Sequence, residues 1–114
     1  MQRNFNLYIN DIQKALTKIE KFTKQITFEK FKNNDLIVDA VSRNLEIIGE
    51  AAKNIPEDIR KKYPYIEWQK IAGLRDVLIH DYFGIDLLIL WDIVKNKVPE
   101  LKIKLKNIKI PIKK

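Results

Sequence analysis

The sequence has no cysteine, a single histidine and no long uncharged hydrophobic run, and each absence removes a class of function. Without cysteine the chain forms no disulfide, no thiolate zinc site and no cysteine nucleophile. One histidine excludes the paired H-x-x-x-H spacing of common zinc hydrolases. The longest apolar stretch, FGIDLLILWDIV, is interrupted by Asp86 and Asp92, so no membrane span is expected. The N-terminus lacks the apolar core of a secretory signal, and we expect a cytoplasmic protein.

Glycine and serine are also scarce, and arginine is rare beside lysine. Glycines at positions 49, 73 and 84 cannot form a Gly-rich phosphate-binding loop. The only serine, Ser42, precedes Arg43 within a predicted helix, so a serine nucleophile is not expected. The sequence therefore predicts neither a bound metal nor an organic cofactor. Guanidinium groups, which can bind an anion through two hydrogen bonds, are present at only four positions: Arg3, Arg43, Arg60 and Arg75.

The positive charge is concentrated at the C-terminal end of the chain. The net charge is +7, and residues 95–114 contain eight lysines against one acidic residue, Glu100. A basic segment of this kind attracts RNA or an acidic partner without sequence specificity. A solvated lysine face on a terminal helix is one alternative interpretation, and a membrane-surface segment, which here lacks an aromatic anchor, is another. The length of 114 residues predicts a single domain over residues 1–114, with this lysine-rich segment 95–114 at its end.

Hydrophobic spacing predicts two long helices in the first half of the chain. The first follows Asn4 as N-cap and has an apolar face of Phe5, Tyr8, Ile12, Ala15, Ile19 and Phe22. The pattern ends in TKQITFEKFKNN, where no helix is predicted. The second begins at Asn34 or Asp35, ends near Lys53, and presents Ile37, Val41, Leu45, Ile48 and Ala52. Gly49 inside it costs about 1 kcal/mol relative to alanine, which a close approach of another helix would offset.

Shorter helices are predicted in the second half. One has Pro56 in its first turn and is ended by Pro64, and the next covers about residues 66–81. Asp86 is a good N-cap for a helix that continues through Val94.

The last segment, PELKIKLKNIKI, fits two patterns. Its lysines alternate with apolar residues as in a strand, but Leu101, Leu105, Ile108 and Ile112 also have helical spacing. No partner strand is evident, so we predict a helix that begins near Pro99. The predicted fold class is all-α, an antiparallel bundle of about five helices.

The segment around the only histidine gathers polar groups that are capable of chemistry. Asp76 lies four residues before His80, so on one helix its carboxylate can orient the imidazole and fix its tautomer. Arg75 and Tyr82 are seven residues apart and share another face of the same helix. Each of these residues also has a structural interpretation. A lone histidine is often structural, and a tyrosine at a helix end often serves only in packing, as Tyr82 could.

Arg75 and His80 are separated by about 140° around an undistorted helix, so one chain makes a poor active site. Packing of this helix against its copy across a two-fold axis would bring both residue types into one cleft. The chemistry that remains is metal-free cleavage of RNA, which carries its own nucleophile, the 2′-OH. His80 can serve as base or acid, and Arg75 can hold a phosphate with two hydrogen bonds.

The segment RDVLIHDY has the form R-x-x-x-x-H-x-Y, and SRNLEIIGEAAKNIP and YPYIEWQKIAGLR precede it. With FGIDLLILWDIVKNKVPELK after it, the ordered set resembles the HepT toxins of the HEPN superfamily over about residues 35–105. Asp76 is a departure, since relatives commonly have asparagine at that position.

The resemblance implies an all-α HEPN bundle that forms a homodimer and acts as a metal-independent ribonuclease on RNA, with tRNA or mRNA as candidate substrates. It implies that Arg75 and His80 are catalytic, that Asp76 supports them, and that Tyr82 accepts AMP. The donor would be a minimal nucleotidyltransferase antitoxin, MntA, which silences the toxin by adenylylation. The alternative is a catalytically inactive HEPN module that docks a nucleotidyltransferase or binds RNA.

Overall fold

The computed structural model describes residues 4–80 and 86–108, apart from the side chains of residues 76, 77, 79 and 80. It consists of α1 (Phe5–Thr23), α2 (Phe28–Lys32), α3 (Asp35–Lys53), α4 (Glu57–Lys62), α5 (Trp68–His80), α6 (Leu87–Asp92), the π-helix η1 (Ile93–Lys97) and α7 (Val98–Lys106). No strand occurs in these residues, which confirms the all-α prediction. No helix among them is both long and apolar enough to cross a membrane.

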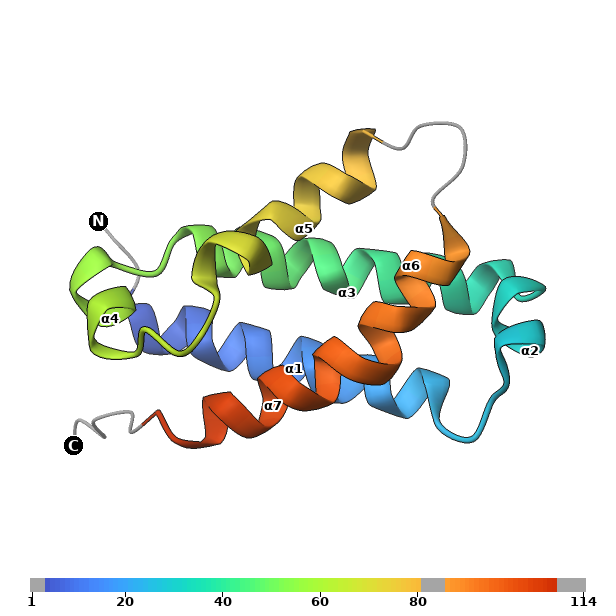
Figure 1. Ribbon diagram of the computed structural model, residues 1–114, viewed down its shortest axis with the longest axis horizontal. Helices are drawn as coiled ribbons and strands as arrows, with labels where there is room; N and C mark the ends of the chain where they lie inside the picture. The colour runs from blue at the N-terminus through green and yellow to red at the C-terminus, as the bar shows by residue number, and fades with distance from the viewer. Residues whose placement is uncertain (1–3, 81–85, 109–114) are drawn as a thin grey trace.

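The longest helices, α1 and α3, run antiparallel and pack along their lengths (Figure 1). On its other side α3 contacts α5, which diverges from it toward the C-terminal end of α5 (Figure 1). The run formed by α6, η1 and α7 crosses the bundle and packs on α1. Helix α3 is therefore the central element, and α5 diverges from it toward its own last residue, His80.

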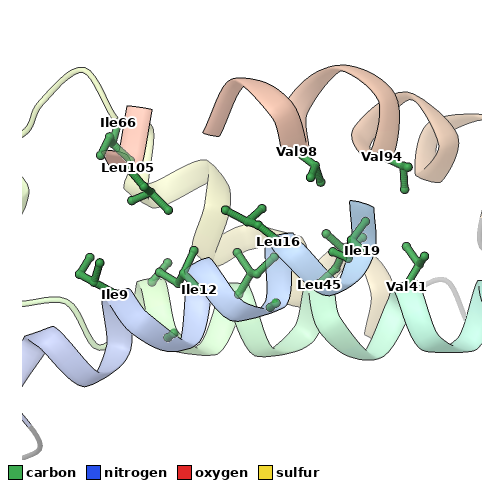
Figure 2. Close-up of a cluster of buried hydrophobic side chains, with 14 of the residues drawn as sticks. Ile9, Ile12, Leu16, Ile19, Val41, Leu45, Ile66, Val94, Val98 and Leu105 are labelled. Atoms are coloured by element: carbon green, nitrogen blue, oxygen red, sulfur yellow. The ribbon is translucent and has the colours of Figure 1, made fainter. Parts of the chain in front are cut away.

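The core lies between α1, α3 and the run from α6 to α7 (Figure 2). Four residues of the predicted α3 face, Val41, Leu45, Ile48 and Ala52, are buried, and Ile37 is half-buried. On α1 the buried residues are Ile9, Ile12, Ala15, Leu16, Ile19 and Thr23. The predicted α1 face is therefore wrong at Phe22, whose side chain is exposed. Thr23 continues the buried face instead, and its hydroxyl donates to the carbonyl of Ile19 at 2.8 Å.

The predicted N-caps are confirmed at all three positions. The Asn4 side chain accepts from the N–H of Asn6, and that of Asn34 accepts from Ile37. Asp86 accepts from the N–H groups of Leu88 and Ile89. Each side chain satisfies donors that the first helical turn leaves without partners.

Helix α2 lies in the stretch for which no helix was predicted. Thr27 caps it by accepting from the N–H of Lys30 at 3.2 Å, and Phe31 is fully buried. The Phe31 ring contacts Trp91 with 5.0 Å between ring centroids. Five residues are too few to show helical periodicity, so the helix is stabilised by this tertiary contact.

The expected break between the last two helices is also absent, because the chain is continuously helical from Leu87 to Lys106. The N–H of Val98 donates to the carbonyl of Ile93, five residues earlier, which is the π pattern. Pro99 has no N–H and its ring displaces the preceding turn. The wider turn accommodates Pro99 and keeps Leu90, Val94 and Val98 buried.

Candidate active site

Helices α3 and α5 approach most closely where Gly49 faces Arg75. A Cβ atom on Gly49 would lie 3.1 Å from the backbone nitrogen of Arg75 and 3.3 Å from the carbonyl oxygen of Ala72. Both distances are shorter than ordinary van der Waals contact. The predicted close helix approach at Gly49 is therefore confirmed, and it fixes where the backbone of Arg75 lies.

Two glycine substitutions are expected to have opposite effects on stability. Gly49→Ala places a methyl group against the α5 backbone, and the resulting overpacking should lower the free energy of unfolding by about 1 kcal/mol or more, despite the better helix propensity. A Cβ on Gly73 would meet nothing within 4 Å, so Gly73→Ala should raise it by up to about 1 kcal/mol. Urea denaturation of both variants checks this. If both substitutions changed the free energy of unfolding equally and in the same direction, the α3–α5 contact would not be tight.

The Arg75 side chain is half-exposed and paired across the two helices. Its Nε lies 3.6 Å from Oε2 of Glu50, and 43% of the Arg75 side chain is exposed. Arg75 also lines an open surface pocket of about 390 Å³. The pocket is lined by Tyr8, Asp11, Arg43, Glu46, Ile47, Glu50, Ala51 and Arg75. We call this the Arg75 pocket.

Two charged residues of α3 form an ion pair within the helix, and a third pairs across to α5. Arg43 Nη1 lies 3.5 Å from Oε2 of Glu46, both on α3. Glu50 instead reaches Arg75 on α5. All three residues line the Arg75 pocket, so the α3 charges border the site. With Asp11, three acidic residues and two arginines line the pocket.

Arg60 has a structural role, because its guanidinium group donates hydrogen bonds to backbone carbonyls. Its Nη2 donates to the carbonyls of Ala52 and Lys53, at 2.8 and 3.1 Å, and its Nε donates to that of Ile55. The carbonyls of Ala52 and Lys53 lie at the C-terminal end of α3, where the helix leaves acceptors without partners, and that of Ile55 follows the helix. Among the described arginines, Arg43 and Arg75 line the pocket.

The other predicted site residues are described only in part. Asp76 and His80 belong to α5, which is helical from Trp68 to His80, but their side chains are outside the description. Five residues of helix place the His80 backbone about 7.5 Å along the axis from that of Arg75. Tyr82 lies outside the described residues. In the part of the chain that the structure describes, no three His, Cys, Asp or Glu residues form a cluster able to hold a metal ion.

The described lysines of the C-terminal segment make several intramolecular contacts. Lys102 pairs with Glu20 of α1, and Lys104 pairs with Glu100 at 2.9 Å, which lowers the pKa of the Glu100 carboxyl. The Lys95 ammonium lies 4.6 Å from the centroid of the Trp91 ring. These contacts favour the interpretation of the segment as a solvated helix face.

A second, apolar groove lies between α5 and the run from η1 to α7. Its volume is about 280 Å³, and its floor is formed by core residues, among them Leu45, Ile48 and Leu74. Charged residues line its edge, including Glu67 and Lys70, whose side chains are 2.8 Å apart. The contact with Lys70 lowers the pKa of the Glu67 carboxyl, and Glu67 raises the pKa of Lys70.

Glu50 makes a contact with Arg75 that the sequence alone did not predict. It stands 25 positions before Arg75, so no helical spacing connects the two residues. The available signal was its position directly after Gly49, the residue predicted to permit a close helix approach.

Comparison with known proteins gives a consistent result. The model of the family described as ribonuclease HepT-like matches residues 12–108. A candidate ribonuclease HepT of Thermococcus cleftensis is 46% identical over 109 residues, which cover 96% of this chain and 99% of the relative. A candidate RNase of Methanocaldococcus jannaschii is 48% identical over 101 residues, which cover 89% of this chain and 84% of the relative.

A candidate RNase of Caldanaerobacter subterraneus is 40% identical over 101 residues, which cover 89% of this chain and 90% of the relative. No solved structure gives a significant match to the chain. The family match extends over most of the sequence and includes α5 with Arg75 and His80. The resemblance found in the sequence is confirmed, and the chain belongs to the ribonuclease HepT-like family.

Proposed function

We propose that this chain is a metal-independent endoribonuclease toxin of a type VII-like toxin–antitoxin pair. The observation that carries the proposal is the half-exposed guanidinium of Arg75 in an open pocket, five residues before the only histidine of a ribonuclease HepT-like chain. An exposed arginine fork suits a phosphodiester, and a histidine titrates near neutral pH. The substrate is RNA, because RNA supplies the attacking 2′-OH.

In the proposed reaction, the 2′-oxygen forms a bond to phosphorus while the bond from phosphorus to the 5′-oxygen breaks. In the proposed dimer cleft, one His80 accepts the 2′-OH proton while the second His80, in its protonated form, supplies a proton to the departing 5′-oxygen. Arg75 binds the non-bridging oxygens, on which negative charge accumulates in the transition state. Asp76 precedes His80 by one helical turn and orients its imidazole. The products are a 2′,3′-cyclic phosphate and a 5′-hydroxyl.

The active form is proposed to be a homodimer in which α5 and its copy line one cleft. The reason is the rotation of about 140° between residues 75 and 80 on a regular helix, which a two-fold axis compensates. Helix α5 diverges from α3 toward its C-terminal end (Figure 1). A monomer in light scattering at micromolar concentration would contradict this arrangement.

Regulation is proposed to occur by transfer of AMP to Tyr82 from a minimal nucleotidyltransferase antitoxin of the MntA type. The modification would add a nucleotide and a negative charge beside Arg75. The lysine-rich segment 95–114 is not needed for this mechanism.

Growth of cells that express the chain alone tests the proposal. Expression without the antitoxin should arrest growth, and His80→Ala should abolish the arrest at equal protein level. Co-expression of the nucleotidyltransferase should restore growth to the unmodified chain. Harmless expression of a folded, unmodified chain would instead support an inactive docking module.

A further inference from the structure

Glu50 lies directly after Gly49, where the backbones of α3 and α5 come closest. Its Oε2 is 3.6 Å from Nε of Arg75, and 54% of the Glu50 side chain is exposed. We propose that Glu50 is a positioning residue, which holds the Arg75 guanidinium by its Nε edge and leaves the Nη edge free for an RNA phosphate. This inference rests on the role proposed above for Arg75.

The geometry of the guanidinium group supports this division of its two edges. The planar fork can bind an anion either through Nε and one Nη or through both Nη atoms. The carboxylate of Glu50 lies on the Nε side. An arginine side chain with four rotatable bonds has many conformations, and a carboxylate at one edge restricts them before substrate binds.

The pairing contributes little to folding, because both side chains are about half-exposed and water screens their attraction. It also has an electrostatic cost for RNA binding. Glu50 lies beside Arg75, and a carboxylate beside a phosphate site repels RNA. Without a positioning role, removal of Glu50 should therefore improve RNA binding and cleavage. With that role, removal should impair the chemical step, so the two interpretations predict effects of opposite sign.

Steady-state cleavage of a short RNA by the full chain tests the proposal. Glu50→Ala should lower kcat by roughly 10-fold while KM stays equal or falls. The reason is that the substitution weakens the contact of Arg75 with the phosphate in the transition state. Glu50→Gln retains an acceptor oxygen at the same position, so its kcat should fall by a smaller factor. In an Arg75→Ala background, Glu50→Ala should cause no further loss.

Asp39→Asn is the matched control for Glu50→Gln. Asp39 is an exposed carboxylate of the same helix, 11 residues toward its N-terminus and outside the Arg75 pocket. The control removes the same charge from α3 about 16 Å away along the axis, so kcat should not change. Thermal denaturation of each variant separates loss of folding from loss of positioning.

The Nε–Hε resonance of Arg75 in NMR spectra gives a readout that needs no RNA cleavage. In the unmodified chain, this proton should exchange with water more slowly than that of Arg43, and Glu50→Ala should remove the difference. An unaltered exchange rate, or a kcat that rises in Glu50→Ala while the unmodified chain is active, would overturn the positioning role. An unmodified chain that does not cleave RNA would overturn the proposed function instead.

Discussion

Replacement of either Arg75 or His80 should remove nearly all RNA cleavage while the fold is retained. Loss of a general acid or base typically costs about 10²–10⁴-fold in rate, and loss of one transition-state hydrogen-bond donor about 10²–10³-fold. His80→Ala and Arg75→Ala should each lower kcat within these ranges. Initial rates on a fluorescent RNA oligonucleotide measure the effect.

Stability should change little in Arg75→Ala, because the ion pair with Glu50 is exposed and contributes at most about 1 kcal/mol. Arg75→Lys is an informative second variant, since lysine retains the charge but lacks the planar fork. The kcat of Arg75→Lys should remain far below that of the unmodified chain. Arg43→Ala removes another guanidinium from the same pocket and serves as the comparison. An equal loss in Arg43→Ala would indicate that the pocket acts only through its total charge.

Adenylylation of Tyr82 should silence the enzyme in proportion to the fraction modified. Tyr82 stands seven residues after Arg75, close to two helical turns, so a regular helix would present both on one face. A phosphodiester on the tyrosine oxygen would then occupy the position where Arg75 binds the scissile phosphate. Tyr82→Phe keeps the aromatic ring but lacks the acceptor oxygen. This variant should stay active and escape silencing by the nucleotidyltransferase with ATP and magnesium.

Intact-mass spectrometry before and after incubation decides this prediction. The unmodified chain should gain the mass of one AMP group, and Tyr82→Phe should gain none. Tyr65→Phe is the matched control, because Tyr65 is an exposed tyrosine, 43% accessible, and should not be the acceptor. Silencing of Tyr82→Phe without added mass would show that the antitoxin inhibits by occlusion alone.

Much of the fold follows from local signals in the sequence. The side chains of Asn4, Asn34 and Asp86 begin helices at the predicted residues, because capping involves only the first turn. The buried face of α3 follows from spacing over five turns. The tight contact at Gly49 also has a local signal, a glycine that interrupts an otherwise favourable helix.

The features that were missed depend on contacts between distant parts of the chain. Phe31 stabilises α2 by packing against Trp91, which is 60 residues away in sequence. The π turn before Pro99 keeps the helix continuous because Val94 and Val98 must remain buried together. Glu50 joins the candidate site only once α3 and α5 are packed. The motif itself, from Arg75 to Tyr82, was found by its spacing and by its resemblance to a family.

The central claim is that this chain cleaves RNA with its own residues and without a metal ion. Its most direct test is incubation of the purified, unmodified chain with a short single-stranded RNA in excess EDTA, followed by mass analysis of the fragments. We predict cleavage at an undiminished rate, with 2′,3′-cyclic phosphate and 5′-hydroxyl ends. Cleavage that EDTA abolishes and magnesium restores, or fragments that end in a 5′-phosphate, would contradict the claim.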